Sequence, residues 1–387
     1  MKLRLVLFLL FFSQNAANAR VILDKKIFYA ELNGQVDLKF GYALNQSAFR
    51  DKPKDKTSNY SNLSLLYLQS VSANTQIGLG IKAGISDIIN KLSTFNVEKL
   101  DIEERYFVIK NKALGSINYG KKNLVSQSML INTSKIYAAA GGVNGNWANY
   151  ANLRGEVKKF DGPGYENDKV FWVKPNIYSN HNGLNSANVT PVISYISPAI
   201  YNFQFGLSYV PGKNNLEYSN LIGAGLSYQN SLSEDISFTA ALTGELARQN
   251  FTDAQKCIED HKCNNPLKHW NFGVNVKFFN FNGIFSYGDG GNSGWVGTTE
   301  TKNTYYMNAG VAYHSGSSKL SLTYFTSKKE ISNSGLNELS SYALSLERPL
   351  FIGTSYYFDV VKFETQEPKI QNNNSGYVFL AGLKLNL

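Results

Sequence analysis

The chain has 387 residues, of which 43% are apolar, 13% aromatic and 17% charged, and its formal net charge is +9. A composition with 24 Tyr, 24 Phe and 32 Gly but only 9 Pro favours many strands joined by polar loops. The basic excess includes no dense Lys/Arg run and no basic helix, so we expect no nucleic-acid partner.

The N-terminal residues 1–19 predict a cleaved secretory signal peptide. Lys2 and Arg4 precede an apolar run at 5–12, and Ala17 and Ala19 supply the small residues that a signal peptidase reads. This run is too short to span a membrane, which takes a helix of about 20 residues. We therefore expect cleavage after Ala19 and one mature domain over 20–387, whose net charge is two lower, at +7. An uncleaved anchoring helix is the alternative.

Alternation of apolar and polar residues is the dominant pattern of the mature chain. Over 32–40 every even position is apolar or glycine and every odd position is polar, and the same period returns at 77–85 and 377–387. A period of two is typical of a strand with one apolar and one polar face. No stretch after the signal approaches 18 apolar residues, which excludes a helical membrane protein.

The alternating segments come in pairs, joined by short and long connections in turn. This order is typical of an all-β, antiparallel up-and-down barrel that crosses a membrane, and an even number of strands lets the sheet close. A soluble β-sandwich is the alternative, but no domain break or linker divides the chain. Tyrosines recur near strand ends, as at a membrane boundary: Tyr209, Tyr228, Tyr287, Tyr313 and Tyr324. The sixteen predicted strands are 30–41, 60–71, 74–86, 101–111, 114–121, 188–197, 202–211, 219–230, 234–248, 269–279, 281–288, 303–314, 317–328, 338–348, 351–363 and 374–387.

The two cysteines, Cys257 and Cys263, lie close together in a polar segment. In an exported chain such a pair predicts a disulfide within a loop. A metal site with His261 and a pair of free thiols are the alternatives. A structural metal site usually takes four ligands, and no fourth is nearby, so we expect no metal.

Several segments resemble the trimeric general porins of Gram-negative bacteria. The stretch 192–198 (VISYISP), followed by 203–209 (FQFGLSY), is similar to that family's hairpin with a Tyr-x-Ser-Pro turn, and 105–109 with 114–121 is similar to its pre-constriction hairpin. Family members commonly carry Gly-Arg there, whereas this chain has Gly-Lys-Lys at 120–122. The segment 270–273 (WNFG) also looks familial. The family usually ends on Phe, and this chain ends on Leu387.

The resemblance implies an outer-membrane barrel of sixteen strands, embedded in lipid and assembled as a homotrimer. It implies a water-filled channel for passive diffusion of ions and small hydrophilic solutes, with a third long loop folded into the lumen. A substrate-specific channel and a non-conducting adhesin or structural barrel are the alternatives.

The longest connection, at about 122–187, follows the fifth predicted strand and is far longer than an ordinary loop. Acidic groups on such a loop, facing basic groups of the wall, set up a field that screens solutes by size and charge. Residues 170–173 inside it are interpreted as loop, since a strand there makes the count odd. Each candidate charge has an ordinary solvated position as its alternative. The candidate loop acids are Glu156, Asp161, Glu166 and Asp168, and the candidate wall bases are Lys39, Lys82, Arg105, Lys121 and Lys122.

Enzyme motifs are incomplete. The sequence Gly115-x4-Gly120-Lys121 lacks the Ser or Thr of a P-loop and opens no helix, and neither G-x-S-x-G nor H-E-x-x-H occurs. We therefore expect no enzyme activity and no cofactor.

Overall fold

The computed structural model describes residues 20–24, 28–45, 56–86, 101–136, 147, 150–151, 191–211, 218–249, 266–293, 295–296, 299–331, 335–368 and 372–386. The signal segment 1–19, the four candidate loop acids, residues 170–173 and both cysteines lie outside these ranges.

One antiparallel sheet contains all the named strands except the short β13. Its first half consists of β1 (Arg20–Asp24), β2 (Phe28–Asn45), β3 (Lys56–Ser70), β4 (Thr75–Ser86), β5 (Asp101–Asn111), β6 (Gly115–Lys121), β7 (Val192–Ile196), β8 (Phe203–Val210) and β9 (Tyr218–Ser231). The second half consists of β10 (Ile236–Gln249), β11 (Leu267–Phe278), β12 (Phe281–Asp289), β14 (Thr299–Ser315), β15 (Ser318–Ile331), β16 (Gly335–Phe351), β17 (Thr354–Glu367) and β18 (Asn372–Asn386), and β13 (Trp295–Val296) pairs with β14.

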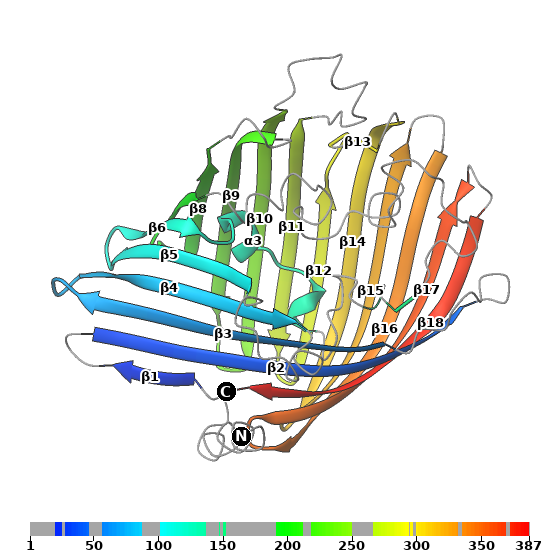
Figure 1. Cartoon of the computed structure of the whole chain (residues 1–387), viewed down its shortest axis with the longest axis horizontal. Helices are drawn as coiled ribbons and strands as arrows, with labels where there is room; N and C mark the ends of the chain where they lie inside the picture. The colour runs from blue at the N-terminus through cyan, green and yellow to red at the C-terminus, as the bar shows by residue number, and fades with distance from the viewer. Residues whose placement is uncertain are drawn as a thin grey trace.

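The sheet closes on itself. Each strand from β2 to β12 pairs with the next, β12 pairs with β14, the pairing continues to β18, and β18 returns to β2 with Leu383 opposite Leu38. Setting aside β1 and β13 leaves a ring of sixteen strands, which confirms the predicted barrel (Figure 1). Each of the sixteen predicted ranges overlaps one strand of this ring, with bounds that differ by a few residues.

Two short strands were not predicted. β1 pairs with residues 29–33 of β2, and β18 pairs with residues 35–45 along the same edge of β2. β1 therefore lies end to end with β18. The structure also lengthens several strands beyond the alternating pattern: β3 begins at Lys56 rather than at residue 60, because the backbone ladder with β2 continues through polar residues.

The connections alternate as predicted. One end of the barrel has the short turns 71–74, 112–114, 197–202, 232–235, 279–280, 316–317 and 352–353, and the other end has the longer loops. The exceptions are the connections β15–β16 and β17–β18, which are only a few residues long although they lie at the long-loop end.

The outer and inner faces of the wall differ in chemistry. Phe107 (63% exposed), Leu242 (50%) and Leu322 (53%) point outward, whereas Asn308, Ser286 and Ser345 on the inner face are fully buried. Apolar residues outside and polar residues inside are what a barrel in lipid requires. Aromatic pairs lie on the outer face near the short turns, with ring centroids 4.8 Å apart for Phe203 and Tyr228 and 5.0 Å apart for Phe281 and Tyr313. Within the described residues, no helix has the length and apolar content needed to span a membrane.

The outward face gives a first prediction. Leu242 lies in the middle of the outward apolar series of β10, so L242R should lower the free energy of unfolding in lipid by about 2–4 kcal/mol. The same change at Leu232, which is 75% exposed in a short turn, should cost about 1 kcal/mol or less. Urea titration in vesicles measures both, and equal effects of the two substitutions would contradict the assigned faces.

Candidate functional site: a loop held across the inner wall

The chain leaves the wall after β6 and enters the barrel interior. A short helix, α3 (Val125–Ser128), and a 3-10 turn, η4 (Thr133–Lys135), follow Lys121. Figure 1 shows α3 inside the ring of strands. Leu124, Ile131 and Ile136 are almost completely buried.

Apolar contacts fix the segment at three successive places around the wall. Leu124 packs with inward residues of β7, β8, β9, β10 and β11. Ile131 and Ile136 pack with inward residues of β10, β12 and β14. Trp147 and Tyr150 pack with inward residues of β14 to β18 and of β2. The described part of this loop therefore follows the inner wall from β7 round to β2.

Glycines on the wall make room for the loop. A Cβ atom at Gly206 would lie 2.5 Å from Cγ1 of Val125, and one at Gly273 would lie 2.5 Å from the carbonyl oxygen of Ile131. Real Cβ atoms do not approach other atoms so closely, so these positions of β8 and β11 admit only glycine while the loop is in place. At these glycines the segment packs directly against the backbone of the wall.

Hydrogen bonds fix the position of the loop along the strands, in addition to the apolar packing. The backbone N–H of Val125, one of the first N–H groups of α3 that the helix cannot satisfy itself, donates to Oγ of Ser208 at 2.8 Å. Oγ of Ser126 donates to Oε1 of the buried Glu245 at 2.5 Å. The N–H of Thr133 donates to Oδ1 of Asn308 at 3.0 Å. These bonds tie α3 to β8 and β10, and η4 to β14.

The far end of the described loop is held by aromatic stacking. The ring of Trp147 lies 5.5 Å from that of Phe363 on β17, with an interplanar angle of 26°. The Tyr150 ring lies against Gly41 of β2. This cluster fills the interior beside β14 to β18, and its members are buried.

The covered and uncovered parts of the wall differ in burial. Many inward residues of β10 to β18, such as Glu245, Asn308 and Val361, are buried, whereas Lys277 near the short turns is exposed. Inward residues of β3 to β6 include the half-buried Ser64 and Gln76 and the exposed Lys110, beside the buried Leu68, Val108 and Asn118. Water therefore reaches the inner wall mainly along β3 to β6.

Three of the predicted basic wall residues lie on the inner side. Lys39 is 3.5 Å from Asp37, and Lys82 is 2.5 Å from Glu103. Lys122 donates to Oδ1 of Asn118 at 3.1 Å, and its ammonium lies 3.9 Å from the centre of the Tyr106 ring. Burial lowers the pKa of the Lys122 amine, and the nearby Glu104 carboxylate opposes that shift.

Arg105 and Lys121 correct the prediction, because both lie on the outward face. Arg105 pairs with Ile81 and with Lys121, and it shares the face of Phe107 and Ile109, both exposed. Phe107 and Ile109 determine which face of β5 meets the lipid, and Arg105 is on that face. A β-bulge opposite Lys82 and Ala83 changes the side to which residues point only before Glu104. The Lys121 ammonium donates to the carbonyl oxygen of Ile102.

Several residues of the interior were missed from the sequence. The acids Asp37, Glu103, Glu245 and Glu347 are inward, and Oδ1 of Asp37 accepts a hydrogen bond from the Tyr357 hydroxyl at 2.8 Å. The alternation of β2, β10 and β16 places three of these acids on the polar face of their strands, so this pattern could have identified them as inward. No sequence pattern marks Trp147 or Tyr150 as the residues that reach the opposite wall.

Comparison with known proteins agrees with this architecture. The sequence matches the family model for the Gram-negative porin over residues 6–367. An uncharacterized protein of Rickettsia bellii is 23% identical over an alignment of 394 positions that covers 86% of each chain. One of Rickettsia felis is 22% identical over an alignment of 355 positions that covers 76% of each.

Two solved structures have a similar fold. A mutant of Rh. blastica porin has a TM-score of 0.54 and 12% identity, and the match covers 92% of this chain and 100% of the other. A loop-deletion mutant of OmpT, an outer membrane protein of Vibrio cholerae, has a TM-score of 0.54 and 12% identity, with 94% and 100% covered.

The contact between the loop and the wall glycines gives a second prediction. G273A should push the loop off β11, because its Cβ meets the backbone oxygen of Ile131, at a cost of about 1–3 kcal/mol. Limited proteolysis in micelles should then cut the 122–191 connection faster. G283A is the matched control, because nothing lies within 4 Å of a Cβ there. Equal cleavage rates for G273A and the wild type would show that the loop does not pack against Gly273.

The buried hydrogen bond to Glu245 gives a third prediction. E245Q keeps an oxygen that accepts from Ser126, whereas E245A removes it and leaves a cavity beneath α3. Thermal unfolding should show E245A destabilised by about 1–3 kcal/mol relative to E245Q. If E245A is as stable as E245Q, the bond to Ser126 does not hold the loop.

Proposed function

The chain belongs to the Gram-negative porin family, and from this premise we propose that it forms a water-filled channel for passive diffusion of ions and small hydrophilic solutes across the outer membrane. The observation that carries the proposal is the inner wall, which is covered by the loop beside β7 to β18 and is open to water along β3 to β6. A closed barrel with a polar inner face and a partly filled interior is a narrowed channel rather than a solid core. We propose no enzyme activity and no cofactor.

The proposal includes export and assembly. Cleavage after Ala19 is supported by the start of β1 at Arg20, since the strand that continues the line of β18 begins there. The homotrimer rests on family membership. The disulfide between Cys257 and Cys263 rests on their spacing and on export to an oxidising compartment.

The constriction is proposed to lie between the loop and the inner lysines. Glu156, Asp161, Glu166 and Asp168 belong to the connection that enters the barrel, which supports placing them in the lumen. Lys39, Lys82 and Lys122 provide positive charge on the inner wall, and Lys39 and Lys82 are already paired with wall acids. The loop acids would add a second, opposed set of charges.

Solute flux tests the channel. Vesicles that contain the purified protein should swell at once in isotonic solutions of small sugars, and the rate should fall steeply as the sugar becomes larger. Vesicles without protein are the control. Swelling no faster than in the control would contradict the proposed function.

Ion preference tests the wall charges. Replacing Lys39, Lys82 and Lys122 together by Gln should shift the reversal potential in a KCl gradient toward cation preference, because positive charge is removed from the lumen. Replacing Arg105 and Lys121 by Gln removes outward charges and should leave the potential unchanged. If the outward pair shifts the potential as much as the inner three, the assignment of faces is wrong.

A further inference from the structure

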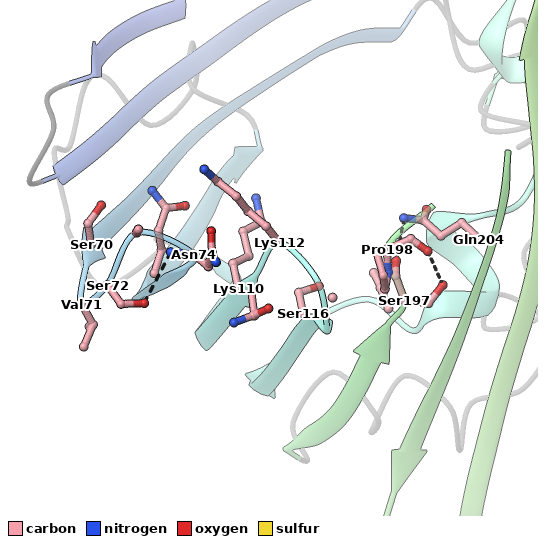
Figure 2. Close-up of a pocket in the computed structure, with 15 residues that line it drawn as sticks. Ser70, Val71, Ser72, Asn74, Lys110, Lys112, Ser116, Ser197, Pro198 and Gln204 are labelled. Atoms are coloured by element: carbon pink, nitrogen blue, oxygen red, sulfur yellow. Dashed lines mark hydrogen bonds between the residues drawn. The ribbon is translucent and has the colours of Figure 1, made fainter. Parts of the chain in front are cut away.

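A polar pocket lies at the short-turn end of the uncovered wall. Its volume is about 670 Å³, and it is formed by the β3–β4 turn, the β5–β6 turn and the start of the β7–β8 hairpin (Figure 2). Inward residues of five neighbouring strands contribute to it in a row: Gln76, Lys110, Ser116, Ile196 and Gln204. The pocket therefore opens toward the lumen, on the side where water reaches the wall.

Hydrogen bonds hold the turn that carries the lysines. Oδ1 of Asn111 accepts from the N–H groups of Ala113 and Leu114, and Nδ2 of Asn111 donates to Oγ1 of Thr75 at 2.9 Å. The N–H of Lys112 donates to the carbonyl oxygen of Asn74 at 3.0 Å, and the Tyr195 hydroxyl donates to that of Leu114 at 2.9 Å. The turn is thus fixed from both neighbouring hairpins, which lowers the entropy lost when a ligand binds.

The lysines of this pocket differ from three other lysines of the inner wall. Lys39, Lys82 and Lys384 each have a carboxylate partner, at 3.5, 2.5 and 3.5 Å. Lys110 and Lys112 are exposed and form no ion pair among the described residues. None of the described residues that line the pocket is acidic. Figure 2 shows the two lysines next to each other, between Asn74 and Ser116.

Hydrogen-bond donors surround the two ammonium groups. Asn74, Gln76 and Ser116 offer amide and hydroxyl donors, and Gln204 is oriented by its bond to the carbonyl oxygen of Ser197 at 3.0 Å. Two positive charges with neutral donors and no carboxylate suit an anion with several oxygens, which accepts from both lysines and from an amide at once. A neutral sugar would leave both charges uncompensated, and a cation would be repelled.

We propose that this pocket binds small oxyanions of the phosphate class at the short-turn mouth of the channel. The proposal rests on the proposed function for its physiological meaning, because the site would concentrate such anions where they leave the lumen. Short turns face the periplasm in barrels of this kind. A weak site at the exit accelerates flux when it attracts the ion without retaining it.

Binding of inorganic phosphate to the full-length mature protein in detergent micelles tests the site without requiring conduction. Isothermal titration calorimetry should show one class of site, weakened about tenfold in K110Q or K112Q, because each substitution removes one charge-assisted hydrogen bond. K110R and K112R should retain binding. K362Q is the matched control, because Lys362 lies on the outer face and is paired with Glu364 at 2.7 Å.

Bilayer recordings test at which end of the channel the phosphate site lies. Phosphate added at the short-turn side should reduce the chloride current at lower concentration than phosphate added at the other side, and the difference should vanish in the K110Q/K112Q double variant. Binding that is absent from the wild type, or unchanged in the double variant, would overturn the site. Dependence on anionic lipid instead of added phosphate would assign the lysines to a headgroup and overturn it as well.

The two proposals fail separately. Conduction without phosphate binding would remove the site and leave the channel. Phosphate binding that depends on Lys110 and Lys112 in a protein that conducts nothing would keep the site and remove the channel.

Discussion

A sheet that crosses a membrane must return to its own first strand, because lipid offers no hydrogen-bond partner to an open edge. Here β18 meets β2 along 35–45, and β1 covers the adjoining part of the same edge at 29–33. Once the ring is closed, every strand has one face toward lipid and one toward the interior. The alternation of the sequence, the aromatic pairs near the short turns and the buried polar residues inside all follow from that closure.

Closure also creates an interior too wide for the wall's own side chains to fill. The protein fills part of it with the loop after β6, which packs against three apolar patches of the inner wall in turn. The loop needs both apolar contacts and space, so apolar residues and glycines replace polar residues on the wall beneath it. Beside β3 to β6 the wall stays polar, and it carries Lys82, which is paired with Glu103, and Lys110 and Lys112, which form no ion pair within the part of the chain that the structure describes.

The strands could be predicted because their signal is local. A residue such as Leu38 reveals its face through its neighbours at positions 36 and 40, and a closed antiparallel barrel imposes little else. β5 shows the limit of this reasoning: Glu104 and Arg105 are both charged, and Arg105 faces outward because it is in unbroken register with the outward Phe107. A charged residue near a strand end is tolerated on either face, so charge alone could not assign it.

The candidate site was harder to predict, because its contacts join distant parts of the chain. Trp147 and Phe363 are more than two hundred residues apart, and Ser126 and Glu245 are more than one hundred apart. A long loop predicts that something is held inside, but the sequence of the loop does not say which strand each residue reaches. The glycines at 206 and 273 were equally ambiguous, since glycine in a strand also marks bulges and barrel corners.

The most direct measurement is single-channel conductance of the purified mature protein in planar bilayers, beside a variant in which 125–190 is replaced by a short turn. Discrete steps from both proteins, with a larger step from the shortened one, are expected if the loop narrows a water-filled barrel. Steps of equal size would contradict the narrowing, and an absence of steps from the wild type would contradict the channel itself.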